Sequence, residues 1–220
     1  MQATINRMPR FCLCVFLATL LLLNNLPNPQ ASQGARKTPG ADARPTGKVV
    51  NGVYRNPSFG FACKVPFGWV DRTADMREEG SAEGKEAAKS LVLLAVFERP
   101  PEATGNTINS AIVIAAEKTS EYSGLKTAAD YFGPITELAT AKGLKVINEP
   151  YDFPVDAKRL VRGDFSKPRG SLTMVQSSLV ILEKGYAVSF TFIGGSEDEV
   201  NGLVGNLKLA GEKGASLSHK

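Results

Sequence analysis

The sequence predicts an α+β fold: a mostly antiparallel sheet with helices on both faces, in an α/β/α sandwich. Near the C-terminus, segments with strand character follow one another with only short turns between them, which favours antiparallel pairing. One of them, residues 172–182, is apolar at odd and even positions alike, so both faces of its sheet need cover. Apolar residues at helical spacing in 127–143 and 196–207 predict the helices that supply this cover.

The first part of the predicted domain is organised around residues 54–69. Asn56-Pro57-Ser58 has the composition of a turn. The residues after it alternate between bulky and small or polar side chains, which predicts a strand with one buried face. The bulky residues are Phe59, Phe61, Cys63 and Val65. Pro66 should end the strand because it has no N–H, and Phe67 and Trp69 should then cap the core.

The other elements follow from the same patterns. In chain order we expect a short strand at 49–54, one or two surface helices within 71–89, a hairpin of strands 91–97 and 111–116, a helix at 127–143, strands at 144–148, 160–165, 172–182 and 186–193, and a final helix from 196. Thr127 and Asp130 resemble a capping box, Gly133-Pro134 should kink or split that helix, and Gly143 should end it. Residues 166–170 and 183–185 should be the turns between the last strands.

The N-terminus predicts a targeting segment. Arg7 and Arg10 precede an apolar run at 11–23, which is too short to span a bilayer comfortably and is typical of a signal peptide. We therefore expect a signal peptide at 1–31 with cleavage between 31 and 35, and export to the periplasm or the extracellular space; an uncleaved membrane anchor is the alternative. A flexible linker at 32–48, a domain at 49–210, monomeric and without a membrane span, and a disordered tail at 211–220 complete the prediction.

Three stretches resemble the PsbP-like superfamily. They are the aromatic–turn–Phe-Gly-Phe strand of 54–69 that ends in Pro-Phe-Gly-Trp, the helix at 128–143, and the last strand and closing helix at 185–209. The resemblance implies an antiparallel sheet between helices. It also implies action by binding, because known members bind photosystem II in plants, a Ran GTPase in the nucleus, and lipids in some exported mycobacterial members. No binding-site signature of those branches is present here.

Histidine and cysteine usage excludes several chemistries. His219 is the only histidine and lies in the predicted tail, so Ser-His-Asp and Cys-His nucleophiles and His/Cys metal sites are not expected. Cys63 is the only cysteine beyond the predicted signal peptide, which rules out an internal disulfide, and its place on an apolar strand face predicts a small buried side chain. The weak net charge of +4 gives no reason to expect a nucleic-acid partner.

Carboxylates are the remaining catalytic candidates. The nearest to a cleft-forming pair are Glu117, Glu121, Asp130 and Glu137, and we expect all four to be solvated surface charges. A second acidic group comprises Asp71, Asp75, Glu78 and Glu79. It does not fit a calcium loop, because Met76 and Ala82 stand where an EF-hand needs Gly and Glu.

Three other features have both a functional and a structural interpretation. Gly194-Gly195 could cradle a phosphate, but the acids at 197–199 would repel it, so a strand-to-helix turn is expected. The basic segment 167–170 could dock an acidic partner or be an ordinary hairpin tip. Tyr54 and Trp69 could line a ligand pocket, with core aromatics as the default.

These observations favour a non-catalytic exported domain that binds a protein, a lipid or another envelope component. One alternative is a small-molecule carrier, which would need an apolar cavity of several hundred Å³ between sheet and helix. The other is a carboxylate-based enzyme, which would need two buried acids with raised pKa values close together. The sequence assigns no catalytic residue, no metal ligand and no cofactor.

Overall fold

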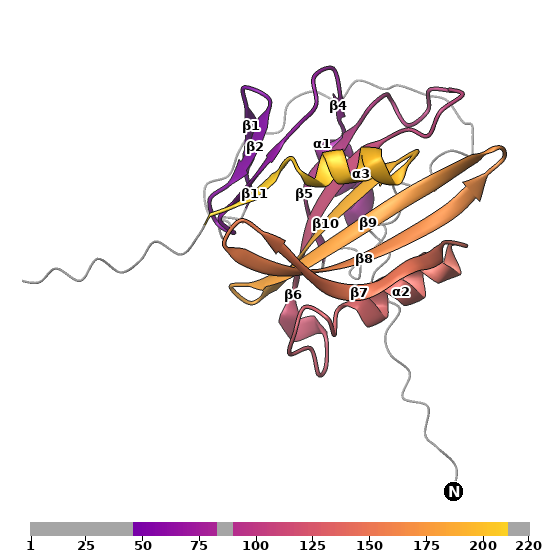
Figure 1. Ribbon diagram of the computed structural model, residues 1–220. Coiled ribbons are helices and arrows are strands. Elements are labelled where there is room, and N and C mark those ends of the chain that lie inside the picture. The colour runs from indigo at the N-terminus through magenta and orange to yellow at the C-terminus, as the bar shows by residue number, and fades with distance from the viewer. Residues whose placement is uncertain (1–45, 83–89, 211–220) are drawn as a thin grey trace, which may run out of the picture.

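The computed structural model describes residues 46–82 and 90–210, and this part of the chain forms two antiparallel sheets (Figure 1). The small sheet has the order β1-β2-β3-β11 and the large sheet the order β4-β5-β6-β10-β9-β8-β7. The strands are β1 (Lys48–Val50), β2 (Val53–Asn56), β3 (Phe61–Lys64), β4 (Val70–Asp71), β5 (Ser90–Phe97), β6 (Ala111–Lys118), β7 (Lys145–Val155), β8 (Lys158–Arg169), β9 (Leu172–Glu183), β10 (Tyr186–Gly194) and β11 (Leu207–Leu209). The helices are α1 (Thr73–Ala82), the 3-10 turn η3 (Thr119–Glu121), α2 (Phe132–Ala141) and α3 (Glu197–Val204).

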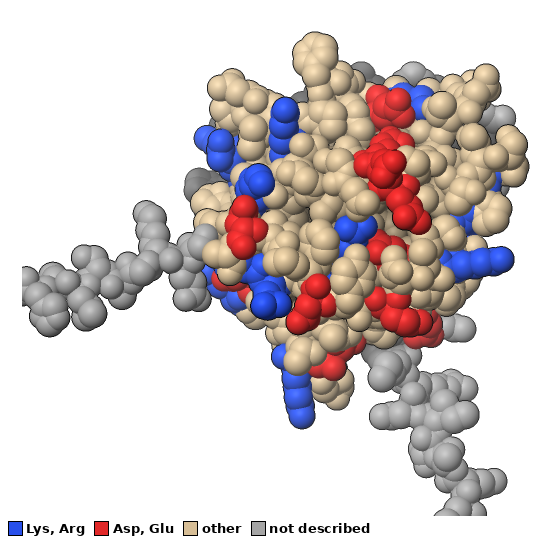
Figure 2. All heavy atoms as spheres, viewed as in Figure 1, with Lys and Arg blue, Asp and Glu red and all other residues tan. Residues whose placement is uncertain are grey.

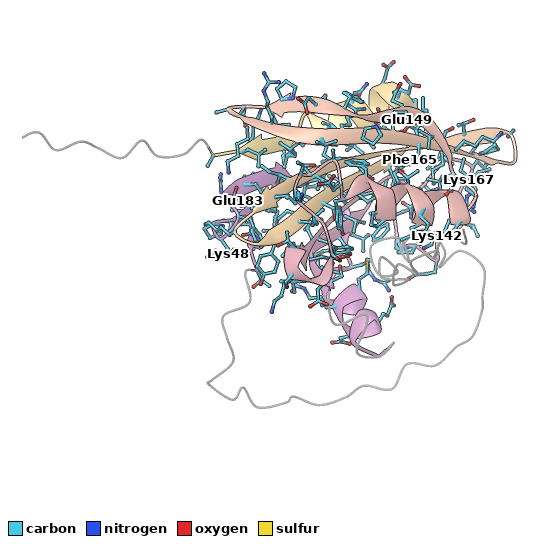
Figure 3. All side chains as sticks on the ribbon, turned by 90° about the horizontal axis from the view of Figure 1, so that it is seen from below. Lys48, Lys142, Glu149, Phe165, Lys167 and Glu183 are labelled. Atoms are coloured by element: carbon cyan, nitrogen blue, oxygen red, sulfur yellow. The ribbon has the colours of Figure 1, made fainter. Side chains whose placement is uncertain are left out.

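The central strands of the large sheet are buried on both faces. On one face, its side chains pack against the small sheet and α3, with Phe61, Val200 and Leu207 in this first core. On the other face, they pack against α1 and α2, with Met76 and Ile135 in the second core. Figure 3, viewed from below, shows α1 and α2 on one side of the sheet and α3 on the other. The α+β fold with helices on both faces is confirmed, and the small sheet is an additional layer beside α3.

The stretch 54–69 has the predicted alternation. Phe59, Phe61 and Cys63 are buried in the first core, and Trp69 packs against it half-buried. The prediction for Phe67 was wrong, because this side chain is fully exposed. The chain makes a tight turn there, with the Trp69 N–H donating to the Pro66 carbonyl, and Gly68 has a positive φ of 82°. Phe67 stands on the outside of that turn.

The predicted single strand at 49–54 is a hairpin of β1 and β2. Val50 pairs with Val53 across a two-residue turn. Asn51 and Gly52 in this turn have φ values of 51° and 70°, as the tight hairpin turn that matches strand twist requires. The Asn-Gly pair is the strongest short hairpin signal, and the hydrophobic pattern alone hides it.

The predicted helix at 127–143 is shorter at its start. Thr127 and Asp130 do exchange the expected bonds, with each backbone N–H donating to the other side chain, but these close a separate turn. Helix α2 begins at Phe132, so Gly133-Pro134 occupies the first turn, where proline is tolerated, instead of producing a kink. Its apolar stripe is buried as predicted at Tyr131, Ile135 and Ala139, and Gly143 ends it with a φ of 78°.

The strands of the large sheet are longer than predicted. β7 continues past Asn148 through Pro150 and Pro154, which an edge strand tolerates because its outer N–H groups need no partner. Residues 166–169, which were predicted to be part of the turn, lie in β8, and the hairpin turn to β9 is confined to Gly170-Ser171. The predicted hairpins of β5 with β6 and of β9 with β10 are confirmed.

The last helix is capped as expected, with Ser196 accepting from the Glu199 N–H at 3.2 Å. It ends at Val204, and the chain then adds β11, which pairs Leu207 with Cys63 and was not predicted. The signal-peptide prediction, most of the linker and the tail lie outside the described residues. Among the helices of 46–82 and 90–210, none is long and apolar enough to cross a membrane.

Candidate functional site

The outer face of the small sheet carries a row of cations. Lys48 is directly opposite Arg55, and both Arg55 and Lys208 are directly opposite Ala62, so register places all four residues on one face. Lys64, opposite Val53, lies on the same face in the next row. The inner face of the same strands carries Tyr54, Phe61, Cys63, Leu207 and Leu209, which belong to the first core. Burial of that inner face therefore fixes the cations toward solvent. We call Lys48, Arg55, Lys64 and Lys208 the basic face.

The basic face lies over a shallow groove of about 700 Å³. Lys48, Arg55 and Lys208 border the groove, and Gly60, Ala62 and Pro57 contribute to its lining. Val50 also lines the groove and exposes 45% of its surface. Thr46 and Ala210, where the described chain begins and ends, also line it. The site therefore combines positive charge with exposed apolar surface.

The charges of the basic face are poorly compensated. In the part of the chain that the structure describes, Lys208 has an ion pair, at 3.8 Å from Asp156, whereas Lys48, Arg55 and Lys64 have none. Like charges directly opposite each other across a sheet are destabilising, as Lys48 and Arg55 are here. Figure 2 shows Lys and Arg side chains over β1, β2 and β11, and acidic ones over α3. A negatively charged partner would relieve the repulsion.

A buried polar network lies away from the basic face, between the large sheet and α3. Arg162 and Asp164, two residues apart on β8, share a face and are joined by an ion pair of 2.8 Å. Ser177 on β9 donates to Asp164, and Asn148 and Tyr151 on the edge strand β7 donate to its other oxygen. Asn201 on α3 accepts from Arg162 at 2.8 Å. The network thus connects three strands to a helix.

The hydrogen bonds of this network set the charge of Asp164. Burial alone would raise the pKa of Asp164, but hydrogen bonds from Ser177, Arg162 and Asn148 outweigh it and hold the pKa below its usual value. Asp164 is therefore ionised at neutral pH and serves as the counter-charge of a guanidinium that is itself almost fully buried.

Glu117 differs from its prediction as a surface charge. It continues the inward-facing positions of β6 and is 2% exposed. The segment between β6 and α2 covers it, and its Oε2 accepts a hydrogen bond from the Tyr122 hydroxyl. Burial raises the pKa of Glu117, and the hydroxyls of Tyr122 and Tyr131 only partly offset that effect. The sequence could not show this, because the covering segment is irregular.

We expect Glu117→Gln to change the pH dependence of stability. A carboxyl whose folded pKa is raised stabilises the fold fully below its unfolded pKa, and this contribution is lost as pH rises through the folded pKa. The variant should therefore be more stable than the parent at neutral pH, by about 1 kcal/mol, and lose this advantage near pH 4. Urea unfolding from pH 4 to 8 measures the difference, with exposed Glu137→Gln as a control that should match the parent. If the free energies of unfolding of Glu117→Gln and the parent differed by the same amount at every pH, the raised pKa of Glu117 would be contradicted.

The other predicted acids are where the sequence placed them. Glu121, Asp130 and Glu137 are exposed, and hydrogen bonds from the Thr127 and Lys126 N–H groups lower the pKa of Asp130. Glu117 lies on the α2 side of the large sheet, and Asp164 lies on the α3 side. Their pKa values shift in opposite directions. The two buried acids of the described chain therefore do not form the pair that carboxylate catalysis requires.

The remaining predicted candidates have structural roles. The Gly194-Gly195 turn is occupied by the chain's own acid, since the Gly195 N–H donates to Glu199 at 2.8 Å. Asp71 accepts from the Thr73 N–H at the start of α1, and Asp75 pairs with Arg72 at 2.6 Å. Within the described residues no group of three or more His, Cys, Asp or Glu side chains is placed to hold a metal ion. Glu78 and Glu79 therefore belong to no such group.

The basic segment at 167–170 is not a free docking tip. Lys167 donates to the Lys142 carbonyl at the end of α2, and the two residues lie close together in Figure 3. Tyr54 is a core residue, as its default interpretation expected, with its hydroxyl accepting from the Gly47 N–H. Cys63 is fully buried, and burial raises its pKa to about 12, so its thiol stays protonated at neutral pH.

Arg162, Asp164 and the basic face were not singled out from the sequence. For Arg162 and Asp164 a signal exists, because they share a strand face with apolar Leu160, and charges on such a face are either edge residues or a buried pair. The basic face could not be found in this way, because it depends on the register of four strands from both ends of the domain.

Known proteins resemble the chain in fold. No family model matches it, and no curated protein matches it. One similar solved structure is cyanobacterial PsbP from Synechocystis, with 13% identity and a TM-score of 0.44, where the match covers 80% of this chain and 98% of that one. A second is LpqN, involved in cell envelope biogenesis of Mycobacterium tuberculosis, with 14% identity, a TM-score of 0.40 and coverages of 69% and 83%. A third is the Ran-binding protein Mog1p of Saccharomyces cerevisiae, with 16% identity, a TM-score of 0.37 and coverages of 69% and 80%. The sequence identity of this chain to all three is low, and the likeness concerns the fold alone.

Proposed function

We propose that this chain is a non-catalytic exported domain that binds an anionic lipid surface through the basic face. The observation that carries the proposal is the outer face of the small sheet, where register aligns Lys48, Arg55 and Lys208 in one row without an acidic residue among the facing positions. Each Lys or Arg near an anionic membrane contributes about 1 kcal/mol to binding. Exposed Val50, two residues from Lys48 on the same face, adds apolar surface that can enter the headgroup region.

The place of the basic face in the chain favours a membrane over an acidic protein. Lys48 is the last residue of the predicted linker, which also carries Arg36, Lys37 and Arg44 against the single acid Asp42. If residues 1–31 direct export, as we expect, these charges and the basic face reach the same envelope surface together. Export remains part of the proposal, since it rests on the sequence of the first 31 residues.

The proposal of a non-catalytic role is supported by the arrangement of the titratable groups. Glu117 and Asp164 lie on opposite faces of the large sheet, and the Asp164 carboxylate is committed to Arg162. His219, the chain's only histidine, was predicted in the tail and lies outside the described residues.

Vesicle sedimentation tests the proposal with matched charge variants. The exported protein should bind vesicles that contain phosphatidylglycerol and not vesicles of phosphatidylcholine alone. Lys48→Glu/Arg55→Glu should weaken this binding by a factor of at least about 30, because it removes two attractive charges and adds two repulsive ones. The control Lys126→Glu/Lys145→Glu changes net charge equally at exposed positions outside the small sheet and should weaken binding by about threefold or less.

Two outcomes would contradict the proposal. An equal loss in both double variants would show that net charge alone drives binding. Absence of vesicle binding, together with binding of polyglutamate that Lys48→Glu/Arg55→Glu abolishes, would assign the basic face to an acidic protein instead.

A further inference from the structure

A second site lies on the other side of β11 from the small sheet's groove. It is a cleft of about 410 Å³ between the β7–β8 end of the large sheet and the α3–β11 connection. Phe153, Val155, Val204 and Leu207 are among its apolar lining residues, and Arg162 and Asn201 are polar ones. Ligand sites commonly have such apolar walls with a few fixed polar groups.

Arg162 is held rigidly in this cleft. Its Nε donates to Asp164 at 2.8 Å, and its Nη2 donates both to Ser177 at 2.9 Å and to Asn201 at 2.8 Å. Its guanidinium carbon lies 5.0 Å from the centre of the Phe153 ring. The side chain is only 10% exposed. A guanidinium fixed on two sides and stacked on a ring loses little freedom when it binds a further acceptor.

The Nη1 edge of the Arg162 guanidinium is open, as a count of its hydrogen bonds shows. A guanidinium has five N–H groups, one on Nε and two on each terminal nitrogen. The bonds above use the N–H of Nε and both N–H groups of Nη2, whereas Nη1 has no partner among the residues of 46–82 and 90–210. Arg162 lines the cleft, so these two donors are available to a ligand there.

The charges around the cleft are paired, so it is the open Nη1 donors that favour an anionic acceptor at this point. Asp164 does not line the cleft. Its carboxylate accepts hydrogen bonds from Arg162, Ser177, Asn148 and Tyr151. At the exposed edge of the cleft, Lys208 and Asp156 form a loose pair of 3.8 Å, so they add no net charge. The open Nη1 donors are then the strongest polar feature that a ligand meets.

The geometry points to this cleft as a binding site for a small apolar carboxylate, whose carboxyl accepts from Arg162 Nη1 and whose hydrocarbon part packs against Phe153, Val204 and Leu207. This inference goes beyond the proposed function, because it concerns a different surface and a soluble ligand. Arg162 is not part of the basic face, and only Lys208 borders both sites.

Calorimetric titration of the exported protein with decanoate tests the inference, with decyltrimethylammonium as the oppositely charged probe. Decanoate should bind with a 1:1 stoichiometry and a Kd below about 1 mM, and the cation should bind at least about tenfold more weakly. Saturable binding of neither probe, or equal binding of both, would overturn the inference.

The informative variant is Arg162→Gln/Asp164→Asn. Replacing both members leaves no unpaired buried charge, which is what makes removal of one member so destabilising. This double variant should fold and bind decanoate at least about tenfold more weakly. Arg159→Gln removes a cation from the same strand at an exposed position that does not line the cleft, and it should bind like the parent. Unchanged affinity in the double variant would overturn the inference.

A second readout does not depend on the variant folding. In the parent protein, saturating decanoate should shift the backbone amide resonances of Phe153–Val155 and Asn201–Leu207. Shifts confined to other elements would place the ligand elsewhere and overturn the inference.

Discussion

Asp164→Ala should lower the free energy of unfolding by roughly 3–5 kcal/mol at pH 7. The substitution leaves the Arg162 guanidinium buried without its counter-charge and removes the acceptor of Ser177, Asn148 and Tyr151. Urea unfolding measures the loss. Asp152→Ala removes an exposed carboxylate from the neighbouring strand β7 and should change the free energy of unfolding by less than about 0.5 kcal/mol.

The same variant has a defined pH dependence. The pKa of Asp164 is lowered in the folded state, so its contribution is present above the unfolded pKa and is lost as pH falls through the folded pKa. The parent and Asp164→Ala should therefore approach each other in stability at acid pH. A deficit of less than about 1 kcal/mol at pH 7, or one that does not change with pH, would contradict the role of Asp164 as the counter-charge.

Phe190→Ala should lower the free energy of unfolding by roughly 3–5 kcal/mol. Phe190 lies on the central strand β10, is fully buried, and meets the ring of Phe61 edge-on with centroids 4.9 Å apart. This pair joins the large sheet to the small one, so its loss opens a cavity between the two layers. Small-sheet residues should consequently exchange their amide hydrogens faster than those of α2.

Phe67→Ala is the matched control for Phe190→Ala. It removes the same side chain from a fully exposed position, and the stability should stay within about 0.5 kcal/mol of the parent. Similar losses in both variants would show that the two sheets do not share the core described here.

The parts of the fold that the sequence predicted correctly are those set by local periodicity. The alternation of Phe59, Phe61 and Cys63 directly gives the buried face of β3, and the two-faced pattern of β9 requires cover on both sides. The cap at Ser196 is equally local, since its partner is three residues away. In each case the physical cause lies within a few residues of its effect.

The predictions that were wrong or missing concern residues whose environment is set by segments distant in the sequence or by their place in the sheet. Glu117 has the appearance of a strand-end acid, and it is buried because residues from the following segment, including Tyr122, fold over β6. β11 has only three residues and exists because β3 offers it an edge. The strand predicted at 144–148 continues through Pro150, because β7 is an edge strand and tolerates proline.

The candidate sites were predicted least well for the same reason. One alternative from the sequence was a small-molecule carrier with an apolar cavity of several hundred Å³ between sheet and helix. A cleft of about 410 Å³ lies beside α3, and the carrier function stays a prediction. It could not show which residues line it, because Phe153, Arg162 and Asn201 come from three elements. The basic face likewise arises only when β1, β2, β3 and β11 are in register.

The most direct test of recognition through the basic face is a nuclear magnetic resonance titration of the labelled protein with bicelles that contain phosphatidylglycerol. Amide resonances of Lys48–Arg55, Phe61–Lys64 and Leu207–Leu209 should shift or broaden, and those of α2 should not. Zwitterionic bicelles should leave the spectrum unchanged. Changes centred on α2 or η3, or equal changes with both kinds of bicelle, would contradict this account.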